Sequence, residues 1–271
     1  MPSPLPAIDV EHFRAFGFVV LRGALDAEAL AAELDRALAV GSTAARGTGV
    51  ARVEYVPMMV AGTPQSLFLL DRFEAAAALL LDGPVVPIRA KGVRYHGSTA
   101  WHADSSDAIV RSLGFAAYLE PLDASTGALR VVPGSHRADF GAAVRDFLAG
   151  GAGTTIDSLP GVSIVTRPGD VIVFDEHLVH ASAGGSVRRQ WRVDYAAEPR
   201  SAADEAALRS YLARIFPPDW DGGYDVDRFP SYGSEWLASG RPAVERLRRL
   251  GAYELASVQE EYARSRLTPR R

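Results

Sequence analysis

The sequence predicts a mainly β protein with flanking helices, in which an antiparallel sandwich or barrel forms the core. Two observations predict this fold class. Between residues 84 and 199, short β-prone runs alternate with clusters of Gly, Pro, Asp and Ser at the spacing typical of antiparallel sheets. On both sides of this region, apolar residues recur at helical spacing instead.

One domain is expected over residues 1–271. A length of 271 residues is ordinary for a single elaborated sandwich or barrel. No internal repeat, low-complexity linker or domain boundary is visible. We expect residues 1–83 to form a helical support for the core at 84–199, and residues 200–271 to form a helical, aromatic-rich extension.

The first forty residues predict two helices with a strand between them. Asp9 is placed to cap a short helix that Gly17 ends, and the apolar run at 18–21 is typical of a strand. A second helix begins near Asp26. It repeats leucine every four residues on one face, at Leu30, Leu34 and Leu38.

The next segment predicts a loop and a third helix. Residues 41–50 are small and polar, so we expect a loop there. Residues 64–81 predict a helix that ends at the Asp-Gly-Pro sequence of 82–84. Six β-prone runs are then expected to supply the core strands, at residues 85–93, 112–119, 128–132, 162–166, 170–174 and 190–196.

After Pro199 the chain predicts a helical piece, an irregular stretch and a final amphipathic helix over residues 242–266. The aromatic residues of the irregular stretch form either a lid or anchors to the core. They are Trp220, Tyr224, Phe229, Tyr232 and Trp236.

The composition excludes several kinds of partner and site. A formal net charge of -4 and a pI near 5.9 give no basic surface for a nucleic acid or an anionic membrane, so a small-molecule substrate is expected. The absence of cysteine excludes disulfides, thiolate catalysis, zinc-thiolate sites and iron-sulfur clusters. Any metal must therefore be bound by nitrogen and oxygen. The sequence does not indicate an oligomeric state.

The sequence favours a cytoplasmic location. Residues 1–10 contain prolines and an acid where a signal peptide would need a basic start and an apolar run. No later stretch is apolar for long enough to span a bilayer.

Two histidines and an aspartate predict a metal site. His102 and Asp104 stand two residues apart, so on an extended segment both side chains point to the same side. His180 follows the apolar run at 169–174. Two histidines and one carboxylate leave positions open on iron(II), whereas a structural zinc site needs four closed ligands. A His-x-Asp pair alone is a weak signal, because most such pairs belong to loops or caps.

Three arginines follow the distal histidine, at 188, 189 and 192. A guanidinium group binds a carboxylate through two parallel hydrogen bonds, which an enzyme that uses 2-oxoglutarate requires. If the last strand extends back to Arg188, then Arg188 and Arg192 share one face and Arg189 lies on the other.

Two segments closely resemble the phytanoyl-CoA dioxygenase family. The first is YLEPLD at 118–123 continuing to GALRVVPGSHR at 127–137, and the second is PGDVIVF at 168–174 leading to HAS at 180–182. The resemblance covers about residues 13–195. It implies a double-stranded β-helix core (jelly-roll, cupin-like), iron(II), 2-oxoglutarate and O2 as cofactor and co-substrates, and oxidation of a small molecule.

The resemblance also implies roles for particular residues. His102 and Asp104 resemble the first two iron ligands of the family, and His180 resembles the third. His177 is the competitor for the third position, but His180 alone is followed by Ala-Ser. Three residues separate the two histidines, which places them on opposite faces of an extended strand.

For the co-substrate, Arg188 resembles the arginine that binds the distal carboxylate of 2-oxoglutarate. Ser182 resembles the hydroxyl near the same carboxylate. The interval from the distal histidine to Arg188 is shorter than the family pattern, which keeps Arg189 and Arg192 as alternatives. Of these two, Arg192 is the first choice, because it shares a face with Arg188.

Other residues near the predicted site have two readings each. Lys91 and Tyr95 lie upstream of the His-x-Asp pair, where they either contact 2-oxoglutarate or the substrate or lie on the surface. Trp101 either packs in the core beside the metal or forms a wall of the substrate pocket. His12 is expected to be a surface or boundary residue without a catalytic role, and His136 is expected to be structural, in a tight turn.

The expected function is an iron(II)- and 2-oxoglutarate-dependent dioxygenase that hydroxylates or otherwise oxidises a small molecule in bacterial secondary metabolism. Desaturation, epoxidation and ring formation are alternatives with the same cofactors. Halogenation is disfavoured, because Asp104 occupies the position that a halide would need. An acyl-CoA substrate is disfavoured by the lack of a dense Lys/Arg cluster. The alternative from another class is an inactive jelly-roll protein that binds a metal or ligand.

Overall fold

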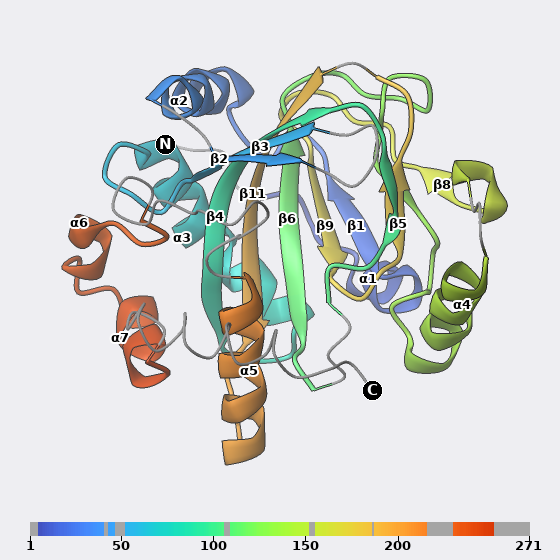
Figure 1. The fold of residues 1–271 in the computed structure, drawn as a ribbon. Helices are drawn as coiled ribbons and strands as arrows, with labels where there is room; N and C mark the ends of the chain where they lie inside the picture. The colour runs from blue at the N-terminus through green and yellow to red at the C-terminus, as the bar shows by residue number, and fades with distance from the viewer. Residues whose placement is uncertain are drawn as a thin grey trace.

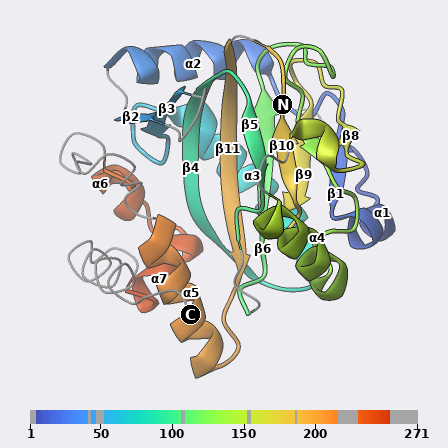
Figure 2. The ribbon, with the colours of Figure 1, turned by 45° about the vertical axis from the view of Figure 1, so that its right-hand side comes forward.

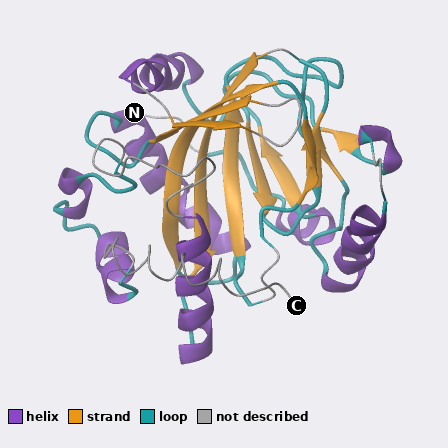
Figure 3. Cartoon of the chain, viewed as in Figure 1, coloured by secondary structure: helices purple, strands orange, loops and turns teal. Residues whose placement is uncertain are grey.

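Two antiparallel sheets with helices around them form the protein (Figures 1 and 3). In the computed structural model the described residues are 5–40, 43–46, 52–105, 109–151, 155–185, 187–215 and 230–251. Within them the larger sheet has seven strands and the smaller sheet has four. The jelly-roll type of core that the resemblance implies is confirmed.

The larger sheet contains the longest strands. Every neighbouring pair in it is antiparallel, and β4 and β11 pair over eleven register positions. Its strands, in spatial order, are β1 (Phe18–Leu21), β9 (Val171–Asp175), β6 (Ser112–Tyr118), β11 (Val187–Ala197), β4 (Val85–His96), β3 (Arg52–Pro57) and β2 (Thr43–Arg46).

The smaller sheet consists of short strands that face the larger sheet. Its strands, in spatial order, are β5 (Thr99–His102), β10 (His180–Ser182), β7 (Arg130–Val131) and β8 (Val162–Ser163). An apolar cluster from both sheets holds the two layers together; it includes Ala116, Tyr118, Leu129, Val131, Ile172 and Phe174.

Strand β6 shows why a core run carries almost no polar side chains on either face. All seven of its residues are buried, because both of its faces are covered. Leu113 and Phe115 point outward into the core cluster beneath the helices. Ala116 and Tyr118 point inward to the smaller sheet. Alternation along the strand therefore supplies two different cores.

Helices cover the outer face of the larger sheet. Helix α3 (Pro64–Leu80) lies behind β4 and β11 (Figure 2), and its Phe73 ring stacks on Phe115 with centroids 4.8 Å apart. Helix α2 (Ala27–Val40) buries the predicted leucine face. Helix α1 (Val10–Phe16) starts at Asp9, whose carboxylate accepts the His12 amide hydrogen at 2.9 Å. These three helical predictions are confirmed.

The remaining helices include one that the sequence did not predict. Helix α4 (Ala138–Gly150) interrupts the β region and is followed by the 3-10 turn η1 (Ile156–Ser158). After the last strand come α5 (Ala202–Ile215), α6 (Ser234–Leu237) and α7 (Pro242–Arg249). The prediction of one helix over 242–266 is wrong, because α7 ends at Arg249 and Gly251 has a positive φ of 63°. Residues 252–266 lie outside the described residues.

Two predictions about surface segments need correction. The expected loop at 41–50 contains β2, which pairs with β3 in a hairpin. The lid reading fails for Tyr232 and Trp236, which are buried and stacked with ring centroids 5.6 Å apart. The Tyr232 hydroxyl donates to the Ile88 carbonyl at 2.6 Å, so these two rings anchor the extension to β4. Trp220, Tyr224 and Phe229 lie outside the described residues.

None of the described helices is both long enough and apolar enough to cross a membrane.

Candidate active site

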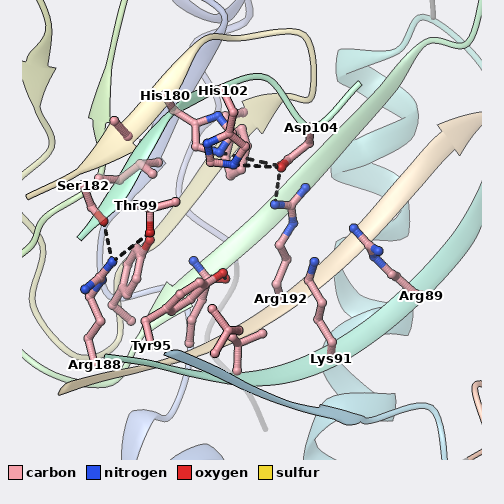
Figure 4. Close-up of a pocket in the computed structure, with 17 residues that line it drawn as sticks. Arg89, Lys91, Tyr95, Thr99, His102, Asp104, His180, Ser182, Arg188 and Arg192 are labelled. Carbon is pink, nitrogen blue, oxygen red and sulfur yellow. Dashed lines mark hydrogen bonds and ion pairs between the residues drawn. The ribbon is translucent and has the colours of Figure 1, made fainter. Parts of the chain in front are cut away.

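The predicted metal ligands meet where two short strands of the smaller sheet pair. The register of β5 and β10 places His102 opposite His180, and their ring centroids are 4.2 Å apart. Asp104 follows the end of β5 and turns back toward both rings (Figure 4). The three residues offer ligand atoms within 4.8 Å of one another, and no other such group of three occurs among the described residues.

Backbone carbonyls fix the tautomer of both imidazoles. His102 Nδ1 lies 2.8 Å from the Ala100 carbonyl, and His180 Nδ1 lies 2.9 Å from the Leu178 carbonyl. A carbonyl only accepts, so each Nδ1 carries the hydrogen and each Nε2 presents a lone pair. The Nε2 atoms face Asp104, at 3.4 Å from Oδ1 for His102 and 3.8 Å from Oδ2 for His180. This arrangement of oriented nitrogen donors and one carboxylate fits iron(II).

The local electrostatics favour the metal-binding forms of two of the three residues, His180 and Asp104. Burial, with His102 nearby, lowers the pKa of His180 to about 4. Burial alone would raise the pKa of Asp104, but the Arg192 guanidinium holds it well below its usual range. Burial also opposes protonation of His102, yet its pKa is raised by the Asp104 carboxylate. A neutral His180 and an ionised Asp104 are the protonation states that metal ligation requires.

The other histidines are turned to different partners. His177 Nδ1 lies 2.9 Å from Asp175 Oδ1. The His136 Nε2 atom lies 3.1 Å from the Arg14 carbonyl, and His12 contacts the rings of Phe16 and Phe18. The geometry therefore favours His180 over His177 as the third ligand.

A cavity of about 310 Å³ opens beside the three ligands, between the two sheets. The larger sheet contributes alternate residues of two adjacent strands to its wall. From β4 these are Arg89, Lys91, Val93 and Tyr95, and from β11 they are Arg188, Gln190 and Arg192. The prediction that Arg188 and Arg192 share one face agrees with this pattern.

Arg188 lies at one end of the cavity and has no carboxylate partner among the described residues. Its Nη1 donates to the Gly97 carbonyl at 2.6 Å, and its Nη2 donates to Ser182 Oγ and, at 3.3 Å, to Thr99 Oγ1. Its guanidinium stacks over the Tyr95 ring, 5.0 Å from the centroid. Nε is buried and has no hydrogen-bond partner in the described part of the chain.

Arg192 lies toward the other end and is surrounded by carboxylates. Its Nη1 donates to Asp104 Oδ2 at 2.5 Å, its Nη2 donates to Glu176 Oε1 at 2.7 Å, and its Nε donates to Asp194 Oδ1. Every edge of this guanidinium is already used. The geometry therefore favours Arg188 over Arg192 as the residue that binds an external carboxylate.

Arg189 points to the opposite face of β11. Its Nε lies 2.6 Å from Glu120 Oε1 and its Nη1 lies 2.5 Å from Asp35 Oδ2, on the outer side of the sheet. These contacts place Arg189 outside the cavity wall.

The model of the phytanoyl-CoA dioxygenase family (PhyH) matches residues 13–190. The chain belongs to the phytanoyl-CoA dioxygenase family. Its cofactor and co-substrate are therefore iron(II) and 2-oxoglutarate, and it is an oxidoreductase. No curated protein matches the chain.

Several solved structures have the same fold. AviO1 from Streptomyces viridochromogenes Tue57 is 26% identical, with 71% of this chain and 94% of that chain covered and a TM-score of 0.56. The α-ketoglutarate-dependent epimerase SnoN from nogalamycin biosynthesis is 23% identical, with 79% and 91% covered and a TM-score of 0.58. HygX from Streptomyces hygroscopicus, with nickel and 2-oxoglutarate bound, is 21% identical, with 70% and 88% covered and a TM-score of 0.58.

Two of the remaining predicted residues do face the cavity of this PhyH-family chain. Lys91 is buried, and its Nζ lies 4.0 Å from Asp194 Oδ2. Burial, together with the cations Arg89 and Arg192, lowers the pKa of Lys91 to about 7. The Tyr95 hydroxyl donates to Gln190 Oε1 at 3.3 Å. The alternative of surface placement is wrong for both residues.

The interpretation of Trp101 as a wall of the substrate pocket is wrong. Trp101 is not among the residues that line the cavity, because it stands on the opposite face of the smaller sheet. It packs against an apolar cluster that includes Val132 and Val179, and its Nε1 donates to the Thr155 carbonyl at 3.2 Å. The reading of core packing beside the metal ligands is the one that the structure supports.

The sequence analysis missed three charged residues near the ligands. Asp194 accepts from both Arg192 and, at 2.5 Å, Arg89 Nε, and Glu176 is fully buried beside them. Arg89 and Asp194 gave a signal, because charges in an apolar strand need buried partners. Glu176 gave none, since it lies in a connection whose path only the fold reveals.

Proposed function

We propose that His102, Asp104 and His180 bind iron(II), and that Arg188 and Ser182 bind the distal carboxylate of 2-oxoglutarate. One observation supports this most. The same cavity is lined by His102, Asp104 and His180, whose ligand atoms lie close together, and by Arg188, which is buried and has no carboxylate partner among the described residues. With 2-oxoglutarate and O2, iron(II) at this site would supply an oxidant that removes hydrogen from a substrate carbon; one oxygen atom of O2 enters succinate as 2-oxoglutarate loses CO2, and the other remains for the substrate.

The protein residues contribute orientation and charge. The Ala100 and Leu178 carbonyls hold both imidazoles in the tautomer that ligates metal through Nε2. Arg188 is held by Ser182, Thr99 and the Gly97 carbonyl, so little ordering remains when a carboxylate arrives. Lys91 supplies a second cation, which binds either the C1 carboxylate of 2-oxoglutarate or an acidic group of the substrate.

The proposed substrate is a small natural product of secondary metabolism. In support, two of the similar solved structures are enzymes of nogalamycin biosynthesis, an epimerase and a carbocyclase, and neither is described as a hydroxylase. The cavity of about 310 Å³ has room for 2-oxoglutarate and the reacting part of a substrate. Hydroxylation is the proposed outcome, with desaturation, epoxidation, ring formation and epimerisation as the other uses of the same site.

The test is product analysis with purified protein, iron(II), ascorbate and 2-oxoglutarate. We expect succinate to form, and to form faster with a true substrate. Mass spectrometry then separates the outcomes: a gain of one oxygen indicates hydroxylation or epoxidation, a loss of two hydrogens indicates desaturation or ring formation, and an unchanged mass with a new retention time indicates epimerisation. Absence of succinate with every candidate would contradict the proposal and favour a ligand-binding protein without turnover.

A further inference from the structure

A chain of buried polar contacts leads from the proposed metal ligand Asp104 to the C-terminal extension. Asp104 Oδ2 accepts from Arg192, and Arg192 Nη2 donates to Glu176 Oε1 at 2.7 Å. The other oxygen of this glutamate, Oε2, accepts from the Tyr211 hydroxyl and, at 2.7 Å, from the Ser112 hydroxyl. Each of these donors is a side chain that the fold buries.

Glu176 also holds the metal segment through its backbone. Its carbonyl accepts the amide hydrogen of Ser105, the residue after Asp104, at 2.9 Å. Its own amide donates to the Ser112 carbonyl at 3.1 Å. Glu176 stands in the connection between β9 and β10, four residues before His180. One buried residue therefore fixes both the side chain and the main chain around Asp104.

Arg192 determines which oxygen of Asp104 remains available. Oδ2 is taken by Arg192 at 2.5 Å, while Oδ1 is the oxygen nearest His102 Nε2, at 3.4 Å. A planar guanidinium can serve three carboxylates at fixed angles, which an ammonium group cannot do. The orientation of Asp104 therefore depends on how Arg192 is held.

The outer part of this chain of contacts lies beyond the family match. That match ends at residue 190, whereas Arg192, Asp194 and Tyr211 follow it. Tyr211 is 2% exposed and belongs to α5, which lies below the ends of β4, β11 and β6 (Figure 1). Helix α5 of the extension thus places the Tyr211 hydroxyl in contact with Glu176, which is the residue that accepts from Arg192.

We propose that Glu176 and Tyr211 are positioning residues, which hold Arg192 and thereby orient Asp104, so that the C-terminal extension is a working part of the metal centre. This inference rests on the proposed metal site. It predicts that loss of the Tyr211 hydroxyl changes metal binding, whereas a purely structural role predicts a change in stability only.

The test compares two tyrosines of the same extension. Tyr211→Phe removes a hydroxyl that donates to Glu176, and Tyr232→Phe removes a hydroxyl that donates to the Ile88 carbonyl, away from the metal ligands. Cobalt(II) is the probe, because it is not oxidised during the measurement. Its affinity is measured by calorimetry and its coordination by the visible absorption of the bound ion.

We expect Tyr211→Phe to weaken cobalt(II) binding by roughly threefold or more and to change its absorption spectrum, because partners of metal ligands typically contribute about 10–100-fold in affinity when removed outright. Tyr232→Phe should stay within about twofold of the parent, with the parent spectrum. Arg192→Lys keeps the positive charge but loses the planar group with several donors, so it should weaken cobalt(II) binding by about tenfold. The double variant Tyr211→Phe/Arg192→Lys should lose less than the product of the two single losses, because Tyr211 acts on Asp104 only through Glu176 and Arg192.

Three results would overturn the inference. Parent affinity and spectrum in a folded Tyr211→Phe variant would exclude the positioning role. Equal losses in Tyr211→Phe and Tyr232→Phe would indicate general destabilisation. Strictly multiplicative losses in the double variant would exclude the connection through Glu176. Failure of the parent itself to bind cobalt(II) would instead remove the proposed metal site, and this inference with it.

Discussion

Arg188 and Arg192 lie on the same strand and the same face, four residues apart, yet their surroundings are opposite. Arg192 donates to three carboxylates, those of Asp104, Glu176 and Asp194. Arg188 donates only to neutral oxygens among the described residues, namely the Gly97 carbonyl and two hydroxyls. The strand positions both side chains, but their neighbours decide which one is left to bind an anion.

The difference has an energetic meaning. A buried cation without a counter-ion is costly, and carboxylate partners offset much of that cost. Arg192 has its counter-ions built into the fold. Arg188 keeps an unmatched charge, which a carboxylate of 2-oxoglutarate would neutralise. Four predictions follow from this contrast.

Loss of a proposed metal ligand should have the largest effect. His180→Ala should abolish succinate formation, because only two ligands would remain. His177→Ala is the matched control and should retain activity, since its Nδ1 faces Asp175. Succinate formation by both variants is compared under saturating iron(II). Full activity in His180→Ala together with loss in His177→Ala would show that the distal ligand is misassigned.

Replacing each arginine with methionine should lower the free energy of unfolding by different amounts. Arg192→Met leaves the buried Glu176 carboxylate without its ion-pair partner and removes one cation from Asp104 and from Asp194, so the free energy of unfolding should fall by about 3–5 kcal/mol. Arg188→Met removes a charge that has no counter-ion, so its loss should be much smaller, about 1 kcal/mol or less. Urea unfolding of the metal-free protein measures both. Equal losses would contradict the contrast.

Arg188→Lys should raise the Michaelis constant for 2-oxoglutarate by about ten- to a hundredfold, because lysine cannot make the two-pronged contact with a carboxylate. Iron affinity should change little, since Arg188 does not contact the metal ligands. Initial rates of succinate formation against 2-oxoglutarate concentration give the constant. A large effect in Arg192→Lys and none in Arg188→Lys would move the co-substrate site along the strand.

Arg189→Lys should have the smallest effect. Its ion pairs with Glu120 and Asp35 lie on the outer face of the sheet, where such pairs contribute about 0–1 kcal/mol. Both the Michaelis constant for 2-oxoglutarate and the midpoint of thermal unfolding should stay near those of the parent. A shift in the Michaelis constant comparable with that of Arg188→Lys would place Arg189 at the site after all.

Much of this arrangement could be predicted from the sequence, because it follows from local rules. Strand alternation predicted that Arg188 and Arg192 share a face and that Arg189 does not. The apolar runs predicted five strands of the larger sheet (β1, β4, β6, β9 and β11) and the strands β7 and β8 of the smaller one, but not β2 or β3. Asp9, Gly17 and the leucine face predicted the first two helices. The prediction of a single domain stays a prediction.

The rest depended on contacts between distant segments. Strands β5 and β10, which hold both histidines, have only four and three residues and no period long enough to detect. The hairpin strand at 43–46 is small and polar, and its pairing with β3 rather than its composition makes it a strand. The choice between the two arginines needed Glu176, whose carboxylate reaches Arg192 across 16 residues of sequence.

The most direct test of the central claim is an anaerobic titration of the iron(II)-loaded protein with 2-oxoglutarate, followed by the visible charge-transfer absorption of a keto acid chelated to iron(II). We predict that the parent develops the band, that Arg188→Lys needs about ten- to a hundredfold more 2-oxoglutarate to develop it, and that His180→Ala does not develop it at any concentration. Absence of the band in the parent, or an unchanged titration in Arg188→Lys, would contradict the account.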